Sequence, residues 1–551
     1  MKIYKNKYVP YPPVLLADRQ WPNKQILTAP VWCSVDLRDG NQALETPMNP
    51  IEKKNFFDML IKIGFKEIEI GFPSASQTEY DFARLLIDTH SIPSDVTIQV
   101  ITPAREDLIK RSIEAVKGAP NVIMHLYLST SSIHRKIVFK KNQKEIIDWA
   151  IQGINWIKKY GEELEVPLKL EFTLESFTGT ELEYSAEICN AVIETWGTNK
   201  ERKVIINLPS TVELSTPNIY ADRIEWLHRN LNQRENIILS LHTHNDRGCA
   251  IAATELGLMA GADRVEGTLL GNGERAGNVD ILNLALNLYT QGIDPELDLS
   301  NLPGICRIVQ ECTKMEISKR HPYAGQLIFT AFSGSHQDAV NKGFENQHDK
   351  DNDSLWEMPY IPIDPCDIGR SNVQIIRITS QSGKGGTAYV VKHALGYELP
   401  KMMHADFAKY IQKLTEETGR EVTEQQIVNE FQQIYLGRKR PFEFISYQRI
   451  QNQNDISINI VLIKYKGKCL KIQINESDTF ETYIKSLNCE GILLEFISEQ
   501  SLPHGSCHEF VSYTKLKDKI NGKMSFGVGI DATISIASIK AIMSGLNNLD
   551  N

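Results

Sequence analysis

Short apolar, β-branched runs alternate with longer amphipathic stretches from about Ala29 to Thr330. The alternation is typical of repeated strand–helix units around a parallel sheet. The segments with helical periodicity include Asn49–Ile63, Gln143–Tyr160 and Ile251–Gly261. The eight runs predicted as strands are Val31–Asp36, Glu67–Gly71, Thr97–Ile101, Val122–Leu128, Leu168–Thr173, Val204–Asn207, Ile237–His242 and Arg264–Thr268. Eight such units predict an α/β fold of the TIM (β/α)8 barrel type.

A doubly wound open sheet is the alternative architecture. Such a sheet more often carries a glycine-rich dinucleotide turn after its first strand. Here that turn reads Leu37-Arg38-Asp39-Gly40-Asn41, which favours the barrel.

Polar side chains gather near the carboxyl ends of the predicted strands. They are Arg38 and Asp39 after strand one, His125 and Tyr127 in strand four, Glu175 after strand five, Thr211 after strand six, and His242 and His244 at strand seven. In a barrel these ends meet at one rim, where active sites are built. The sequence therefore predicts one charged site.

The barrel pattern is lost after about Pro322. A stretch rich in Gly, Asp and Pro, from Gly334 to Gly386, predicts an irregular connection with small helical elements. Lys401–Leu436 is helical by pattern, and alternating strands at Ile456–Tyr465 and Lys468–Ile474 precede a last helix at Thr533–Leu546. We expect four parts: an N-terminal extension (1–28), the catalytic barrel (29–325), linker subdomains (326–436) and a C-terminal α+β regulatory domain (437–551).

Composition narrows the class of protein. Of the residues 42% are hydrophobic and 23% charged, and the net charge of −9 offers no basic field for nucleic acid. The nine cysteines form no Cys-x-x-Cys pair, so neither a disulfide framework nor a zinc knuckle is indicated. The first residues lack the apolar core of a signal peptide and no apolar run is long enough to span a bilayer, so we expect a cytoplasmic protein.

His242-Thr243-His244 is the strongest local signal for a metal. Residues i and i+2 of a strand project to the same side and can offer two imidazoles to one ion. Asp39 can complete the set, since strands one and seven flank strand eight in a closed barrel. Two histidines at a strand end can also be satisfied by hydrogen bonds alone, and the same ligand types bind non-haem iron in oxygenases.

Two further segments lie at the predicted rim. Arg38 can clamp a carboxylate or polarise a carbonyl, although it could also form a surface ion pair with Asp39. Gly271–Asn278 follows strand eight, where backbone amides can hold an anion and Asn278 can add a neutral oxygen ligand.

Two segments lie beyond the barrel. Ser380–Gly386 resembles a phosphate loop only superficially, because it lacks the Walker spacing, and we interpret it as a turn. His336 sits among small polar residues, which suits a group brought to a site by a lid or a partner subunit, although an isolated histidine is more often structural.

Four motifs together resemble the 2-isopropylmalate synthase family, in its longer bacterial and fungal form. They are Leu37–Gln42, Leu174–Glu181, His242–Asp246 and Gly271–Asn278. The resemblance continues through Gly334–Asp338 and returns in Gly527–Asp531 and Ala537–Ala541.

The resemblance implies a condensation of acetyl-CoA with 3-methyl-2-oxobutanoate that opens leucine biosynthesis. It implies a divalent metal on Asp39, His242 and His244 with Asn278 close by; Mg²⁺ is the first expectation, and Mn²⁺ or Zn²⁺ would also suit the ligands. Arg38 would stabilise developing negative charge, and Glu175 and His336 would be the acid/base candidates. Thr211 would hold the substrate carboxylate, and His125 and Tyr127 would shape the pocket for the branched chain, unless they are ordinary barrel packing. A homodimer is expected, with leucine as effector.

The chain departs from the family pattern at two places. Ser371 and Asn372 stand where relatives are expected to have a tyrosine, which leaves the acid/base set open. Cys489–Glu495 stands where a glycine-rich leucine-sensing stretch is expected, so leucine inhibition is left open. Homocitrate or citramalate synthases, an aldol-type lyase on the same barrel, and a silent scaffold or amino-acid sensor are the alternative functions. The intact charged rim argues against the scaffold.

Overall fold

The structure is a computed structural model that describes residues 9–331, 333–348, 354–370, 384–418, 422–451, 457–475, 479–487, 489, 491–504 and 507–550. It divides into two compact units. The first holds residues 1–328 and 365–370, and the second holds 329–364 and 371–551. Each unit is described by itself.

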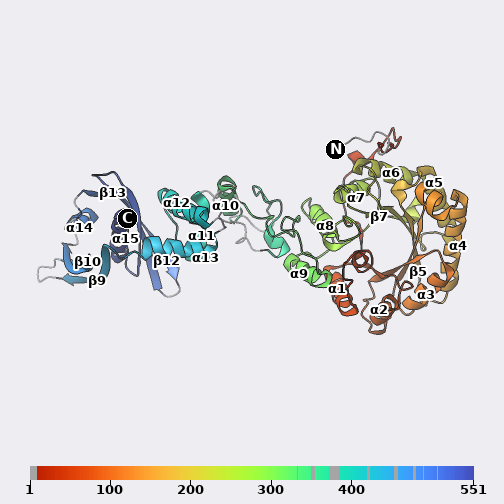
Figure 1. The fold of residues 1–551 in the computed structure, drawn as a ribbon, viewed down its shortest axis with the longest axis horizontal. Helices are drawn as coiled ribbons and strands as arrows, with labels where there is room; N and C mark the ends of the chain where they lie inside the picture. Colours follow the sequence, from red (N-terminus) through yellow and green to blue (C-terminus); the bar gives the residue numbers. More distant parts are fainter. Residues whose placement is uncertain are drawn as a thin grey trace. The chain divides into compact units, whose positions relative to one another are not determined.

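The first unit is a closed eight-stranded parallel barrel, as predicted, with helices around it (Figure 1). The strands follow one another in chain order and β1 pairs with β8 to close the ring. Their bounds are β1 (Val31–Ser34), β2 (Glu67–Gly71), β3 (Thr97–Pro103), β4 (Val122–Ser129), β5 (Leu168–Glu175), β6 (Val204–Ser210), β7 (Ile237–Thr243) and β8 (Arg264–Gly267). The predicted runs differ from these bounds by a few residues at most.

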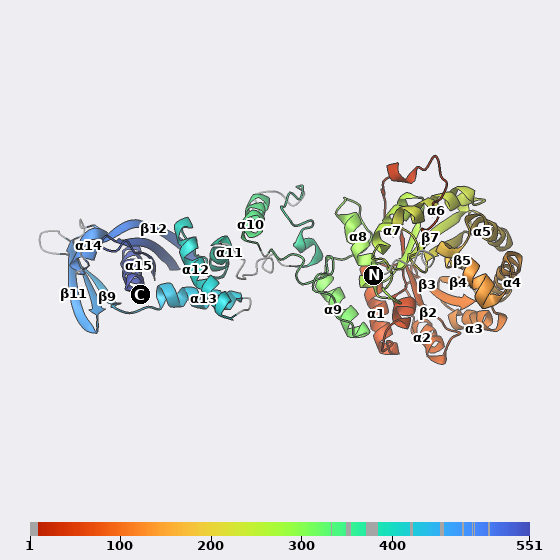
Figure 2. The same ribbon diagram turned by 45° about the horizontal axis from the view of Figure 1, so that its top comes forward.

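A ring of helices covers the outside of the barrel, as Figure 2 shows for α1 to α7. The helices are α1 (Pro50–Ile63), α2 (Gln77–Asp88), α3 (Glu106–Val116), α4 (Gln143–Gly161), α5 (Leu182–Trp196), α6 (Pro217–Asn230), α7 (Ala250–Met259), α8 (Ile281–Tyr289) and α9 (Leu302–Thr313). Local sequence explains their starts. Asn49 and Asn142, for example, each form a capping box with the Glu three residues later, at the first turns of α1 and α4.

The second unit combines helices with two antiparallel sheets, ordered β11-β10-β9 and β12-β13-β14. Its strands are β9 (Phe442–Gln451), β10 (Ser457–Tyr465), β11 (Lys468–Asn475), β12 (Ile492–His504), β13 (Cys507–Asp518) and β14 (Met524–Asp531). Its helices are α10 (Gly334–His348), α11 (Lys384–Leu395), α12 (Lys401–Thr418), α13 (Glu424–Phe431), α14 (Phe480–Ser486) and α15 (Ile534–Leu549). The predicted α+β character is confirmed.

Two expectations for the second unit need correction. Residues 334–348 form one helix, α10, rather than part of an irregular connection. Its sequence is largely polar, but the side chain of Val340 is buried, so packing rather than local pattern favours the helix. The sheets are also larger than predicted, since only β10 and β11 were recognised from alternation. Among the described residues, no helix combines the length and apolarity needed to cross a membrane.

Candidate active site and metal centre

The predicted ligands come from three segments at the carboxyl ends of neighbouring strands. Arg38 and Asp39 lie on η2 (Asp36–Gly40), a single π-helical turn two residues after β1. His242 is in β7 and His244 directly follows it. Asn278 lies on the loop after β8 and forms a backbone bridge with His244. β8 pairs with both β1 and β7, as the sequence argument required.

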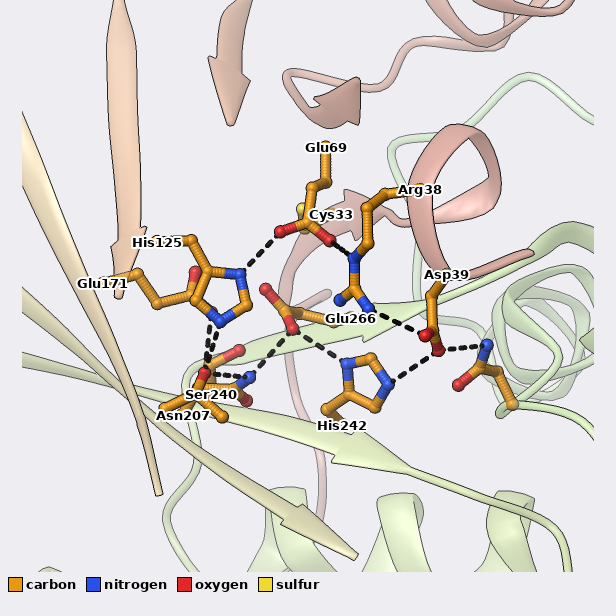
Figure 3. Close-up of polar contacts among 12 residues, drawn as sticks. Cys33, Arg38, Asp39, Glu69, His125, Glu171, Asn207, Ser240, His242 and Glu266 are labelled. Carbon is orange, nitrogen blue, oxygen red and sulfur yellow. Dashed lines mark hydrogen bonds and ion pairs between the residues drawn. The ribbon is translucent and has the colours of Figure 1, made fainter. Parts of the chain in front are cut away.

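These side chains lie close together, and Figure 3 shows the contact between Asp39 and His242. Asp39 Oδ2 lies 3.3 Å from His242 Nε2 and 3.9 Å from His244 Nε2. One potential ligand atom from each of the three residues falls within 4.8 Å of the others, and all three residues are buried. A carboxylate and two imidazoles that share one face are a suitable donor set for a divalent ion.

Two buried polar atoms beside this cluster support the fit. Asn278 Nδ2 donates to Asp39 Oδ2 at 2.9 Å, but Asn278 Oδ1 is buried without a hydrogen-bond partner among the described residues. His244 Nδ1 is also buried without one. Because an unpaired buried polar atom is costly, the two atoms indicate that something outside the chain, an ion or its water, completes the site.

The electrostatics of the cluster follow from its contacts. Burial alone would raise the pKa of Asp39, but Arg38 and the two histidines hold it well below its ordinary value. Burial would lower the pKa of His242, yet hydrogen bonds from its ring to Asp39 and Glu266 raise it to about 9. Burial and the neighbouring positive charge of His242 lower the pKa of His244 to about 4. The site therefore holds a permanent carboxylate and a neutral imidazole at neutral pH.

Arg38 is a largely buried bridge, with its side chain 12% exposed, and not half of a surface ion pair. Its Nη1 lies 2.7 Å from Asp39 Oδ1, and its Nε donates to Glu69 on β2. Glu69 also contacts His125 Nδ1 at 2.5 Å, and His125 Nε2 lies 2.6 Å from the hydroxyl of Thr173. Both partners of Arg38 are carboxylates, which fixes the plane of the guanidinium.

The remaining predicted residues of the barrel occupy the same end of it. Glu175 ends β5 and accepts a hydrogen bond from the hydroxyl of Ser129. Burial and the charge of Glu175 raise the pKa of Tyr127, while Arg38 lowers it, so these three groups are electrostatic neighbours. Thr211 follows β6, and its hydroxyl accepts the N–H of Ser176 at 2.9 Å.

Comparisons with known proteins assign the chain to a family. Residues 29–309 match the model of the HMGL-like family, and residues 326–392 match that of the alpha-isopropylmalate synthase post-catalytic domain-like family. The chain is 52% identical to 2-isopropylmalate synthase of Clostridium acetobutylicum over 98% of its own length and 99% of the relative. It is 47% identical to that of Rhodospirillum rubrum, with 99% of both chains covered. The chain belongs to the 2-isopropylmalate synthase family. Among solved structures, it resembles an HMG-CoA lyase of Bacillus subtilis at 18% identity and a TM-score of 0.43, over 56% of this chain and 97% of that one.

In this member of the 2-isopropylmalate synthase family, the predicted site residue His336 lies outside the barrel unit. His336 belongs to the second unit, where it is exposed on α10 with its ring stacked on Tyr360 at 4.1 Å between centroids. Ser371, Asn372 and most of Ser380–Gly386, where a turn was predicted, lie outside the described residues. The role of His336 remains a prediction.

The sequence argument missed a buried polar layer inside the barrel. Its members are Glu67 and Glu69 on β2, Gln99 on β3, Glu171 on β5, Asn207 on β6, Ser240 on β7, and Arg264 and Glu266 on β8. The signal was present: both β2 and β8 carry charged residues at i and i+2, the spacing that places them on one face. Barrel interiors are usually filled by branched apolar residues, so such a pair stands out.

Proposed function

We propose that the rim of the barrel is the active centre at which this member of the 2-isopropylmalate synthase family condenses acetyl-CoA with 3-methyl-2-oxobutanoate. The methyl carbon of acetyl-CoA loses a proton and attacks the keto carbon, and water then cleaves the thioester to give 2-isopropylmalate and CoA. This acyl transfer is the first committed step of leucine biosynthesis. The observation that carries the placement is the buried cluster of Asp39, His242 and His244 at the carboxyl ends of the strands.

The cluster would hold a divalent ion, with Asn278 as a further oxygen donor. We assign Mg²⁺ first, because open positions remain for oxygen ligands, and Mn²⁺ or Zn²⁺ as alternatives that the two imidazoles also suit. When bound, the ion supplies a Lewis acid for the keto group of the acceptor.

Arg38 is assigned the second stabilising role. Its Nε and Nη1 are engaged by Glu69 and Asp39, whereas Nη2 has no hydrogen-bond partner among the described residues. A guanidinium fixed on two sides with one free donor can hold the keto oxygen as it gains negative charge. Because both carboxylates are already in place, little reorganisation is needed during the reaction.

Glu175 and His336 are assigned to proton transfer. Glu175 would take the methyl proton of acetyl-CoA or activate the hydrolytic water, and its hydrogen bond from Ser129 orients the carboxylate. His336 would be the second acid/base group. Its assignment rests on the family resemblance, and replacement by Ala tests it: turnover should fall while keto-acid binding stays unchanged.

The acceptor pocket is assigned to His125, Tyr127 and Thr211. Thr211 has a hydroxyl hydrogen left to donate to the substrate carboxylate, because its oxygen already accepts the Ser176 N–H. Tyr127 is partly exposed and would lie against the branched chain. His125, held by Glu69 and Thr173, would form the floor of the pocket.

A CoA-release assay tests the function. The protein is incubated with acetyl-CoA, a divalent metal and 3-methyl-2-oxobutanoate, pyruvate or 2-oxoglutarate, and the free thiol is titrated. We expect the branched keto acid to give the highest kcat/KM. Preference for pyruvate or 2-oxoglutarate would assign a citramalate or homocitrate synthase instead, and no release with any acceptor would contradict the condensation.

Assembly and regulation are proposed from the family resemblance. We propose that the chain acts in the cytoplasm as a homodimer. An extension at 1–28 would precede a catalytic barrel at 29–325 and linker subdomains at 326–436. Residues 437–551 would form a regulatory domain for leucine. Light scattering measures the mass of the assembly. Repeating the CoA-release assay with leucine tests the effector.

A further inference from the structure

A fully buried guanidinium lies inside the barrel, on the opposite side of His242 from Asp39. Arg264 on β8 is 0% exposed, and its Nε lies 2.6 Å from Glu67 Oε2 while its Nη1 lies 2.7 Å from Glu266 Oε1. It also donates to Ser240 Oγ at 2.9 Å and to Gln99 Oε1 at 2.8 Å. Glu171 Oε2 lies 3.2 Å from the same Nη1, so three carboxylates and two neutral acceptors compensate the buried cation.

Glu266 connects this guanidinium to the metal cluster, and Figure 3 shows its contact with His242. Its Oε1 faces Arg264, and its Oε2 lies 2.9 Å from Nδ1 of His242. Asn207 Nδ2 also donates to Oε2 at 2.9 Å. On its other side, the same imidazole presents Nε2 to Asp39 at 3.3 Å. The two ring nitrogens of His242 thus face two different carboxylates.

Glu266 determines which nitrogen of His242 would keep its hydrogen when an ion is bound. A carboxylate accepts hydrogen bonds and cannot donate them, so Glu266 stabilises the hydrogen on Nδ1. With a divalent ion beside Asp39, Nε2 would be the nitrogen that offers its lone pair as a ligand. The hydrogen bond also fixes the ring plane, as outer partners of metal-bound histidines generally do.

Arg264 fixes the position of the Glu266 carboxylate for this task. Its Nη1 donates to Glu266 Oε1 at 2.7 Å, which leaves Oε2 directed at His242 Nδ1. Glu171 contacts the same guanidinium, with its Oε2 3.2 Å from Arg264 Nη1. Of the carboxylates that contact Arg264, Glu266 is the one within hydrogen-bond distance of His242 among the described residues.

We propose that Glu266, supported by Arg264, is a positioning residue that aligns His242 Nε2 toward the metal. The inference rests on the proposed metal-ligand set and deepens it. A purely structural role is the competing explanation, in which Glu266 only neutralises Arg264. Glu67 separates the two explanations, because it pairs with the same guanidinium but has no contact with His242 among the described residues.

Metal affinity of the metal-stripped full chain is the decisive readout. Mn²⁺ alone is titrated calorimetrically into the wild type, Glu266→Gln and Glu67→Gln, and circular dichroism verifies the fold of each. Glu266→Gln should weaken Mn²⁺ binding roughly 10–100-fold, the range found for outer partners of metal ligands, while Glu67→Gln stays within about threefold of wild type. Unchanged affinity in Glu266→Gln, or an equal loss in both variants, would overturn the proposal.

Two further variants keep the test decisive. Glu266→Asp retains the negative charge opposite Arg264 but moves the carboxylate oxygen away from His242 Nδ1. This variant should fold and still bind Mn²⁺ more weakly than wild type. Wild-type affinity in a folded Glu266→Asp would overturn the positioning role of Glu266. His242→Ala tests the ligand set itself. If it binds Mn²⁺ as well as wild type, the proposed metal site fails, whereas failure of the Glu266 role alone leaves the His242→Ala loss intact.

Discussion

Asp36 and Asp39 lie three residues apart, are both buried, and have opposite pKa shifts. Asp39 faces Arg38 and two histidines, which outweigh the cost of burial and lower its pKa. Asp36 accepts hydrogen bonds from the Ser34 hydroxyl and the Leu269 N–H, but burial prevails, so its pKa rises to about 7. Neighbouring charge rather than residue type therefore separates the proposed metal ligand from a structural acid.

Asp36 makes the stability of the barrel depend on pH. Its pKa is higher in the folded chain than the ordinary value of 3.8, so the folded state binds the proton more tightly. The stabilisation is complete below the unfolded pKa and is lost as pH rises toward 7. Asp36→Asn mimics the protonated acid and should remove this loss.

We expect the unfolding free energy of the wild type, relative to Asp36→Asn, to fall by about 3 kcal/mol between about pH 5 and pH 8. Urea unfolding of both proteins at the two pH values measures the difference, and the variant cancels contributions from other groups. A constant difference would show that Asp36 is already ionised at the lower pH.

Metal binding and turnover of single variants distinguish the proposed metal ligands from the acid/base candidate. Asp39→Ala and His244→Ala each remove a first ligand, so both metal binding and turnover should be lost, with a larger loss of Mn²⁺ affinity than the roughly 10–100-fold expected for an outer partner. Glu175→Ala should retain the metal and lose turnover. Calorimetry with Mn²⁺ and the CoA-release assay provide the two measurements, and metal retained in all three variants would refute the ligand set.

At the scale of elements, the repeated strands of the barrel were predictable from the sequence, whereas features that depend on tertiary packing were not. Eight apolar runs predicted the barrel, and polar residues at their ends predicted its charged rim. The inner polar layer was missed because Arg264 and Glu266 do not follow the carboxyl end of their strand, where the polar residues of the rim were sought. Helix α10 was missed because its sequence carries few apolar residues, of which Val340 is buried. The placement of His336 relative to the barrel does not follow from local pattern, since it depends on how separate units assemble.

The glycines of the Gly527–Asp531 motif are explained by how closely a strand and a helix pack. Gly527 and Gly529 lie on β14, against which α15 packs. A Cβ atom on Gly529 would lie 2.0 Å from the carbonyl oxygen of Ala537, and one on Gly527 would lie 2.0 Å from that of Ala541. The two glycines therefore permit the backbones of the strand and the helix to approach closely.

Gly529→Ala should destabilise the second unit by about 3 kcal/mol, because the added methyl meets helix backbone that cannot move cheaply. Gly522→Ala is the matched control: its φ is +72°, and a Cβ there meets nothing within 4 Å. It should cost only about 1 kcal/mol, from backbone conformation alone. Chemical denaturation followed by circular dichroism measures both, and equal effects would show that the contact with α15 is unimportant.

At the scale of the whole molecule, the chain forms two units with separate cores. One core of the second unit includes Phe407, Phe431 and Val511, all buried, and a second one includes Val461 and Ile542. The division is not a single cut, because residues 365–370 return to the barrel unit, where Asp367 accepts a hydrogen bond from Tyr289 at 3.0 Å. A chain with separate cores need not unfold in one step.

We expect two thermal transitions, each sensitive to a different change. Mn²⁺ at about a hundred times its Kd should stabilise the barrel by about 2.7 kcal/mol and raise only the transition of that unit, and Asp39→Ala should abolish the rise. Gly529→Ala should lower only the transition of the second unit.

If the second unit is a leucine sensor, leucine should raise the transition that Gly529→Ala lowers and leave the Mn²⁺-sensitive one in place. Differential scanning calorimetry measures all of these shifts. A single transition that responds to both Mn²⁺ and Gly529→Ala would mean that the two units unfold together. Any effect of leucine on the barrel would then arise from this shared stability rather than from a separate sensor.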